Sequence, residues 1–386
     1  MNAAKRATAV LAAAAITLSL SACGTGAATS AASPSPAEEV SATYEGERSL
    51  VLSDDQVTLD GLAIAEEDAG DVTVSHDIVY YESGQGSDYG EGAEADEHDA
   101  EEARAHTVVT IRSAGTYRLS GTLSQGQIAI DLGDDAEDDP DAVVTLILDG
   151  VDVTCTVAPA LIFYNVYECG SSDEETATSD VDTSAAGANV IIADGSVNNF
   201  DGSHVARIYE PGTTDKLHKY DGAFYSKMSM NVSGEIAGDG VLNITGDNEG
   251  LDTELHLTIN GGVINIDAAN DGINTNEDNV SVTTINGGTL NIDAGLGSEG
   301  DSIDSNGLAG RQRRQRFRQR LRGRRRQRHR RLAGNRAQRR HGRGSGQHVR
   351  RHLVRLRAEL SDAHACRTGA KRRRGRAYRR RRQRSV

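Results

Sequence analysis

The feature that most constrains this chain is an internal repeat of short apolar runs between residues 222 and 306. Thr258–Ala268 aligns with Thr284–Ala294 at an offset of 26, and both copies contain Thr-Ile-Asn-Gly-Gly and Asn-Ile-Asp-Ala. Val241–Ile244 aligns with Val263–Ile266 at an offset of 22. Such periods, each with two or three strand-length runs, are typical of a solenoid, in which a repeat buries its apolar face only by stacking on its neighbours.

A second motif, interleaved with the first, predicts how the strands stack. Its four copies are Phe224–Lys227, Leu251–Glu254, Ile273–Asn276 and Ile303–Asn306. Because the repeats follow one another in one direction, strands of successive coils should run parallel, with the apolar residues of Leu-Asn-Ile inside and Asn outside. Gly-Gly and Asn-Gly pairs provide the turns. The sequence therefore predicts an all-β parallel β-helix. The Leu/Asn framework of a leucine-rich repeat is absent, and a β-sandwich would not give this near-constant period.

Charge divides the chain of 386 residues into two parts. Residues 1–300 carry 10 Lys and Arg against 53 Asp and Glu, whereas residues 301–386 carry 32 against 4, so the net charge of −15 describes neither part. The sequence has no Trp and only 4% aromatic residues. This composition excludes a core of large rings and disfavours a flat aromatic platform for crystalline cellulose.

The N-terminus has the three parts of an export signal: basic Lys5 and Arg6, the apolar run Ala7–Leu20, and Leu-Ser-Ala-Cys ending at Cys23. That ending resembles the lipobox of bacterial lipoproteins, in which the peptide is cut before a Cys that is then lipidated. The alternatives are an ordinary signal peptide with a chance Cys and a retained span, for which the run is shorter than the ~20 residues needed. We expect residues 1–22 to be removed and Cys23 to anchor an exported protein on the outer face of the cell membrane.

Three further segments complete the expected organisation. Residues 23–49 are rich in Ala, Ser, Thr and Pro, which predicts a flexible linker. Residues 50–307 should form the β-helix, interrupted by the acidic insertions Glu82–Glu102 and Gly170–Gly187, which we expect to be exposed loops with little fixed structure or, in a functional role, a surface that collects cations. Residues 308–386 are dominated by Arg, and we expect a disordered basic tail.

The tail has the composition that Asp-, Gly-, Asn- and Ser-rich coils would give in a shifted reading frame. In a GC-rich gene most codons end in C or G. When the gene is read one base early, that last base becomes the first base of the next codon, so a codon that begins with G becomes CGN, which encodes Arg. We therefore hypothesise a frameshift near residues 308–311 that replaced further coils. The alternative is a basic arm for nucleic acid or another acidic polymer. Because an exported lipoprotein rarely meets nucleic acid, we expect no such partner.

The segment after the first insertion resembles a known family. The likeness lies in Ser113–Leu123 (SAGTYRLSGTL), Gly126–Ile128, Leu146–Val153 and the Asp-Gly-Ile-x-Thr coil ends. These motifs resemble the bacterial carbohydrate-binding domain family typified by a clostridial cellulose- and pectin-binding protein. The resemblance covers roughly residues 50–307 and implies a right-handed parallel β-helix, cell-surface display, bound calcium, and plant polysaccharide such as polygalacturonate or cellulose as the partner. The two insertions and the loss of the pattern after Gly307 depart from the family.

Acidic and amide side chains are expected to stack at the coil ends. Aligned coils place six of them in two columns: Glu249, Asp271 and Asp301, then Asp252, Asn274 and Asp304. Stacked strands lie ~4.8 Å apart, and two carboxylates at that distance repel by roughly 1 kcal/mol in water. Because Lys and Arg are nearly absent here, we expect Ca²⁺ between them, which takes about six to eight oxygen ligands. The alternative is an acidic ridge neutralised by diffuse counterions.

A shared divalent cation would also let this acidic surface bind uronate polymers. Tyr209, Tyr220 and Tyr225 are candidates for stacking on sugar rings, with packing roles as the alternative. We expect a monomeric, non-catalytic polysaccharide-binding protein. A calcium-dependent pectate-type lyase is the second hypothesis, with Lys227 as the base that removes a proton α to the uronate carboxyl or, in the plainer alternative, as the partner of a neighbouring acid. A structural or adhesive solenoid without a glycan ligand is the third.

The sequence does not decide whether Cys155 and Cys169 form a disulfide. Cys155 and Cys169 can pair across a loop, which an exported protein permits, or remain buried thiols. Their spacing is not that of a Cys-x-x-Cys metal site.

Overall fold

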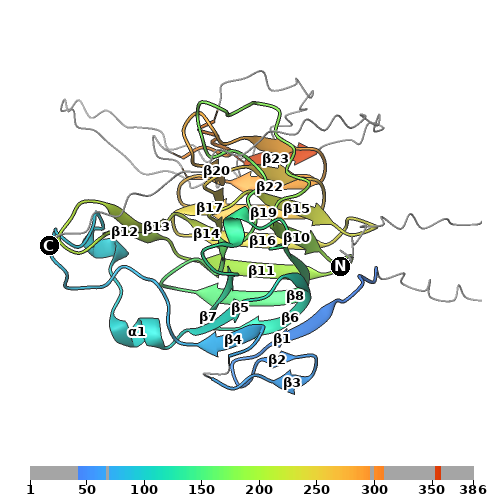
Figure 1. The fold of residues 1–386 in the computed structure, drawn as a ribbon, viewed down its shortest axis with the longest axis horizontal. Helices are drawn as coiled ribbons and strands as arrows, with labels where there is room; N and C mark the ends of the chain where they lie inside the picture. The colour runs from blue at the N-terminus through green and yellow to red at the C-terminus, as the bar shows by residue number, and fades with distance from the viewer. Residues whose placement is uncertain (1–41, 67–68, 296–299, 308–352, 358–386) are drawn as a thin grey trace, which may run out of the picture. The chain divides into compact units, whose positions relative to one another are not determined.

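The computed structural model describes residues 42–66, 69–295 and 300–307, together with the backbone of residues 353–357. These residues form an all-β protein, as the sequence predicts (Figure 1). The helical segments in this part are short: α1 (Ala100–Arg104) and the 3-10 helices η1 (Glu94–Asp96) and η2 (Ala136–Asp138). No helix in the described part is long and apolar enough to cross a membrane.

Three ladders of parallel strands make up most of two large sheets, and Figure 1 shows their strands lying one above another. The first ladder contains β8 (Val144–Cys155), β10 (Ala188–Ile192), β15 (Met230–Gly234), β18 (Leu257–Ile259) and β21 (Thr283–Ile285). The second contains the end of β8, β11 (Val197–Gly202), β16 (Val241–Gly246), β19 (Val263–Ala268) and β22 (Thr289–Asp293). The third contains β5 (Thr107–Ile111), β7 (Gly126–Asp131), β9 (Leu161–Asn165), β14 (Gly222–Ser226), β17 (Glu249–Thr253) and β20 (Ile273–Thr275).

The registers of these ladders agree with the sequence repeat. Val263 lies opposite Thr289 and Val241 lies opposite Val263, which are the expected offsets of 26 and 22. The second motif also stacks as expected, with Leu251 opposite Ile273. From Met230 to Thr275 each repeat therefore supplies one strand to each ladder, and the next repeat supplies β21 and β22 and a single bridge at Ile303.

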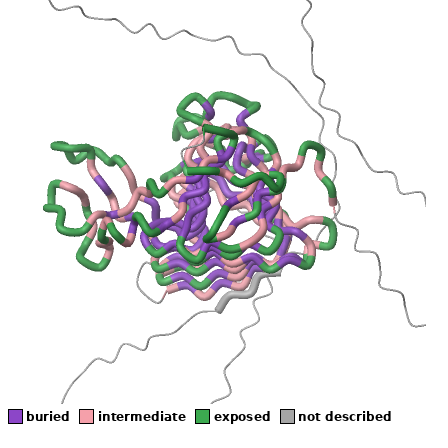
Figure 2. The backbone as a smooth tube through the Cα atoms, turned by 90° about the horizontal axis from the view of Figure 1, so that it is seen from below, coloured by how far each residue is buried: buried purple, intermediate pink, exposed green. Residues whose placement is uncertain are grey.

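Alternation along the strands decides which side chains enter the core. The inward pairs of β16, β19 and β22 are Leu242 with Ile244, Ile264 with Ile266, and Leu290 with Ile292, all buried. Figure 2 shows buried stretches stacked in the body of the protein and exposed ones mainly in the loops around it. The side chains of one strand therefore pack in the core beside those of the strands above and below it.

The outward positions of the same strands carry a ladder of asparagines. Asn243, Asn265 and Asn291 each donate through Nδ2 to the Oδ1 of the asparagine one coil earlier, at 2.8, 2.7 and 2.6 Å, and the first acceptor is Asn199. An amide can donate and accept in the same direction, so this stack satisfies half-buried polar groups without any charge.

Both large sheets are mixed, because antiparallel strands join the parallel ladders. The antiparallel pairs are β1 (Arg48–Leu52) with β2 (Thr58–Leu59), β2 with β3 (Leu62–Ala63), β4 (Val72–Ser75) with β5, and β23 (Leu353–Arg357) with β22. A separate antiparallel hairpin is formed by β12 (Val205–Tyr209) and β13 (Lys216–Tyr220). β6 (Gly115–Leu123) runs parallel to β1 and β8.

Two expected boundaries change. β1 begins at Arg48, inside the expected linker 23–49, because Leu50 and Leu52 bury against the core while Ser49 and Val51, which alternate with them, are exposed. β23 lies inside the expected disordered tail 308–386, where its backbone pairs with the edge of β22. The expected signal peptide, Cys23 and the rest of the tail lie outside the described residues.

The expectation of loosely structured insertions is wrong. In Glu82–Glu102, Glu82 forms a bridge with His98, and the Asp99 side chain caps α1 by accepting the backbone N–H groups of Glu101 and Glu102. In Gly170–Gly187, the hydroxyl of buried Thr183 is hydrogen-bonded to both Asn231 Oδ1 and Thr258 Oγ1 of the first ladder. Local turns and contacts with the strands hold segments whose composition alone suggested a solvated loop.

Cys155 and Cys169 do not form a disulfide. Cys155 ends β8 inside the core and is 1% exposed, whereas Cys169 lies half-buried in the loop after β9, with its thiol directed at the Asp182 carbonyl. Cys155 packs in the core and Cys169 contacts the second insertion, and both are free thiols.

Candidate functional site

The best-defined polar cluster is at the ends of the third ladder, where the sequence predicts the acidic columns. Asp252 of β17 lies opposite Asn274 of β20, and Glu249 is the first residue of β17. All three are buried, Asp252 completely. Strands of this ladder are buried on both faces, so side chains that alternate outward here meet protein rather than water.

Two amides join the two buried carboxyl groups. Asn274 Nδ2 donates to both oxygens of Glu249, at 3.1 and 3.2 Å, and to Asn276 Oδ1 at 2.6 Å. Asn276 Nδ2 in turn donates to both oxygens of Asp252, at 3.0 and 3.1 Å. The sequence did not single out Asn276 as a site residue, although its place in the second motif was visible.

One oxygen in this cluster is left without a partner. With the amide of Asn274 oriented to serve Glu249, its Oδ1 is buried and accepts no hydrogen bond. A buried acceptor without a partner is unfavourable. Within the described residues, no three His, Cys, Asp or Glu side chains converge closely enough to hold a metal ion by themselves. A cation here would therefore need amide oxygens as well as carboxylates, which suits Ca²⁺.

The carboxyl groups of the cluster resist ionisation. Burial, with a further contribution from the nearby Asp221 carboxylate, raises the pKa of Glu249 to about 8. Burial and the neighbouring Glu249 also raise the pKa of Asp252 well above its ordinary value. Each effect penalises the charged form. In the absence of a bound cation, burial therefore favours the protonated form of Glu249.

The expectation that cations are nearly absent from this region needs correction. The hairpin β12–β13 brings Lys219 to within 2.6 Å of Asp221 Oδ2 and Lys216 to within 3.6 Å of Glu254 Oε1. Both lysines are separated in sequence from the acidic columns. Asp221 itself stands one position before its column, since it is Gly222 that lies opposite Glu249, so column alignment does not find it.

The six predicted ligands do not all meet. The charge of Asp271 acts on Glu249, and its Oδ1 accepts the backbone N–H of Asp301 at 2.5 Å. The Asp301 side chain is exposed, and Asp304 Oδ1 accepts the backbone N–H of Ser305 at 2.8 Å. The structure therefore brings Glu249, Asp252, Asn274 and Asp271 together. The backbone of the last coil also pairs with β20, but the Asp301 side chain is exposed and the Asp304 side chain turns back to its own neighbour.

Two of the three predicted sugar-stacking tyrosines are unsuitable. Tyr225 and Tyr220 are 1% and 4% exposed, with ring centroids 5.2 Å apart, and the Tyr225 hydroxyl donates to Glu254. The hairpin covers their rings, which a sequence alignment cannot show. Tyr209 remains half-exposed, with its hydroxyl donating to Glu91 Oε1 at 2.7 Å.

Lys227 follows β14 and is exposed. No ion pair found among the described residues involves it, in contrast to Lys216 and Lys219. Burial, together with the nearby Lys227 charge, lowers the pKa of His218. The proposed pairing of Lys227 with a neighbouring acid is therefore not found in the described part of the chain.

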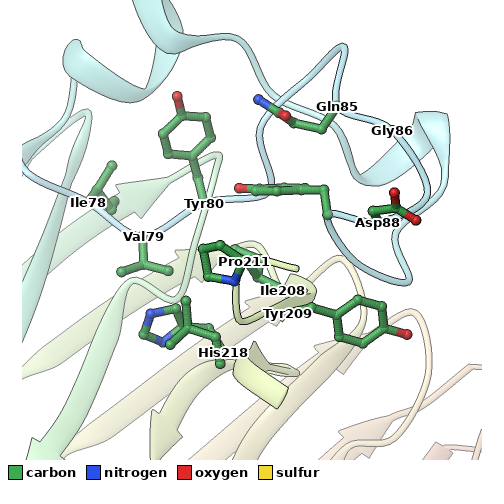
Figure 3. A pocket seen from close by; sticks show the side chains of 12 residues that line it. Ile78, Val79, Tyr80, Gln85, Gly86, Asp88, Ile208, Tyr209, Pro211 and His218 are labelled. Atoms are coloured by element: carbon green, nitrogen blue, oxygen red, sulfur yellow. The ribbon is translucent and has the colours of Figure 1, made fainter. Parts of the chain in front are cut away.

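A pocket of about 640 Å³ lies between the segment Ile78–Tyr89 and the hairpin β12–β13, and no residue of the cluster lines it. Figure 3 shows Val79 and the Gln85–Asp88 loop on one side and Ile208, Pro211 and His218 on the other. Tyr209 is the sole predicted site residue on its lining.

Comparison with known proteins places this geometry in a family. The model of the carbohydrate-binding domain-containing protein family matches residues 105–313, more than half of the chain. The chain belongs to this family. The match covers all but the first coils and includes the cluster around Glu249, and it confirms the resemblance carried by Ser113–Leu123.

Other comparisons add little to the family assignment. A solved structure from C. thermocellum, described as a polysaccharide lyase-like protein in a gadolinium derivative, is similar at 20% identity and a TM-score of 0.36, over 63% of this chain and 81% of that one. No curated protein matches this chain.

Proposed function

We propose that this protein binds polysaccharide without cleaving it, and that calcium held at the coil-end cluster lets it bind acidic glycan such as polygalacturonate. Membership of the carbohydrate-binding domain-containing family supports the glycan partner. The observation that carries the calcium proposal is the unpartnered Oδ1 of Asn274 beside two carboxyl groups of raised pKa. Glu249, Asp252 and Asn274 would hold the ion, whose open coordination positions supply contact with uronate oxygens.

The architecture we infer is a right-handed parallel β-helix with a monomeric state. The three parallel ladders and the regular repeat offsets support the β-helix.

We also propose that the protein is exported and is held by a lipid anchor at Cys23 on the outer face of the membrane. Replacing Cys23→Ala should release the protein from the membrane fraction into the medium, and continued membrane attachment of that variant would contradict the anchor.

The binding proposal is tested with polygalacturonate, in the presence of calcium or of EDTA. We expect binding with calcium, a loss of at least tenfold in EDTA, and a similar loss in Asp252→Asn. Asp267→Asn is the matched control, because Asp267 is an exposed acid on β19 outside the cluster. Calcium-independent binding, or equal effects of the two substitutions, would contradict a calcium bridge at this cluster.

The lyase hypothesis stays open as a second candidate because Lys227 is exposed and forms no ion pair with a described carboxylate. A lyase would generate an unsaturated uronate with ultraviolet absorbance. If the native protein produces this absorbance steadily and Lys227→Ala does not, the protein is a lyase and the non-catalytic proposal is wrong. Binding without such growth supports a non-catalytic protein.

A further inference from the structure

Two insertions into the coil pattern meet and build a second candidate site. Gly90 bridges Ile208, the Glu91 backbone N–H donates to the Arg207 carbonyl at 2.9 Å, and the Tyr209 N–H donates to the Tyr89 carbonyl at 2.8 Å. The backbone of the segment around Gly90 is thereby paired with β12 of the hairpin. The pocket of about 640 Å³ lies along this junction.

The junction is closely fitted. A Cβ atom on Gly90 would lie 2.0 Å from the Arg207 carbonyl oxygen, and one on Gly92 would lie 2.5 Å from the Tyr81 ring. Glycine at these positions allows an approach that other residues would prevent. The pocket is therefore a product of specific packing between two insertions, rather than a gap between independent loops.

The lining of the pocket combines aromatic and polar side chains of the kinds that bind sugars. Three of the 11 tyrosines in the chain line it, Tyr80, Tyr89 and Tyr209, all half-buried, together with Leu217, which is 46% exposed. Amphipathic tyrosine rings suit the C–H face of a sugar. Gln85 and Asp88, also on the lining, offer an amide and a carboxylate for hydroxyl groups. Such a mixture of apolar walls and few polar groups is typical of small-ligand pockets.

The charge of the pocket indicates which sugars fit. No Lys or Arg is among the residues that line it, and Asp88 is an acid. The neighbouring guanidinium of Arg207 is paired with Glu91 at 3.3 Å. Lys227 is a nearby cation that acts on the lining, through His218. Within the lining itself, a uronate carboxylate would meet the Asp88 charge without a cation beside it, whereas a sugar that carries only hydroxyl groups would meet no like charge.

We propose that this pocket binds a neutral sugar residue of a polysaccharide, with the tyrosines and Leu217 against the ring and Gln85 and Asp88 on its hydroxyls. The proposal extends the glycan-binding function to a second class of sugar and rests on that function only in requiring that the chain binds polysaccharide. It needs no calcium. One protein would then carry a cation-dependent site for acidic glycan and a cation-independent site for neutral glycan.

The test is calorimetric titration of the full chain with uncharged β-1,4-linked hexamers of glucose, xylose and mannose, and with a galacturonate hexamer, each in calcium and in EDTA. The variants are Tyr80→Ala and Leu217→Asp, neither of which removes a side-chain hydrogen bond found in the structure. Ile236→Asp is the matched control, because Ile236 is 69% exposed and lies outside the pocket. Melting temperatures establish that each variant is folded.

We expect at least one neutral hexamer to bind equally in calcium and in EDTA. Tyr80→Ala and Leu217→Asp should each weaken that binding at least tenfold, and Ile236→Asp should leave it unchanged. The inference is overturned if no neutral hexamer binds at millimolar concentration, if folded pocket variants bind as the parent does, or if only galacturonate responds to them. Loss of the neutral binding alone leaves the calcium proposal intact, and loss of the calcium-dependent binding alone leaves this one intact.

Discussion

Asn274 donates its side-chain amide to both carboxyl oxygens of Glu249, at 3.1 and 3.2 Å, from the neighbouring strand of the same ladder. The carboxyl oxygens of Glu249 therefore accept hydrogen bonds from a neutral amide, and Glu249 forms no ion pair with a described residue. Burial, together with the nearby Asp221 carboxylate, outweighs this hydrogen bond and the Lys219 charge, which both lower the pKa of Glu249, and the pKa therefore rises. The energetics of the cluster should consequently depend on pH and on cations.

Stability in EDTA should fall as the pH rises. Because the folded pKa of Glu249 is about 8 against an ordinary 4.5, the folded chain keeps a proton that the unfolded chain releases between these values. The contribution is complete below about pH 4.5 and lost by about pH 8. Thermal melting should show this decline, and Glu249→Gln should flatten it. An equally steep decline in that variant would contradict the assignment to Glu249.

Calcium binding at the cluster should release protons at neutral pH. Only the ionised carboxylate is a good ligand, and Glu249 holds its proton at pH 7 because burial raises its pKa to about 8. Affinity should therefore rise from pH 6 to pH 9. Calorimetry in two buffers of different ionisation enthalpy should give different heats. Identical heats in both buffers would place the ion elsewhere.

Gly90→Ala should separate the first insertion from the hairpin. The new Cβ would lie 2.0 Å from the Arg207 carbonyl oxygen, so the backbone pairing cannot persist unchanged. Limited proteolysis should cut residues 83–99 faster than in the parent. Gly86→Ala is the control, since no atom lies within 4 Å of its Cβ position. Equal cleavage of the two variants would show that the close approach does not matter.

Leu251→Ala should destabilise the protein by about 2–5 kcal/mol, because a fully buried leucine leaves a cavity that packed neighbours cannot fill. Leu62→Ala, at a side chain 75% exposed, should change stability by less than about 0.5 kcal/mol. Chemical denaturation measures both. A loss below about 1 kcal/mol for Leu251→Ala would mean that the ladder core is loosely packed.

The two described cysteines should react as thiols. Burial raises the pKa of Cys155 to about 12 and that of Cys169 to about 11. Maleimide should therefore label half-buried Cys169 slowly at pH 8 and label Cys155 only after unfolding. Peptide mapping without reductant checks this. Failure of both to react in denaturant, followed by reaction after reduction, would indicate a disulfide.

The repeat in the sequence predicts the ladders well because each coil contacts mainly the next. Opposed residues such as Val241 and Val263 therefore carry matching patterns at a constant offset. The same locality explains the correct gathering of Glu249, Asp252 and Asn274. These residues share one ladder, and their neighbours are fixed by the period alone.

Contacts between distant insertions were not predictable in this way. Tyr225 follows the pattern of its column, but a hairpin outside the repeat covers it, with the Tyr220 ring 5.2 Å away. Lys216 of that same hairpin lies 3.6 Å from Glu254 Oε1, directly after a strand that belongs to the repeat. Nothing in the period encodes where an insertion folds back, so the tyrosine pocket and the lysine neighbours of the acids emerge only from the three-dimensional arrangement.

The pairing of β23 with β22 has a consequence for association between molecules. A parallel ladder leaves an edge on which a coil of a second copy can continue, which would lead to end-to-end polymers. Here the backbone groups along Thr289–Asp293 face Leu353–Arg357, a strand of the same chain running the opposite way. Any filament growing from this edge would first have to displace the molecule's own C-terminal segment.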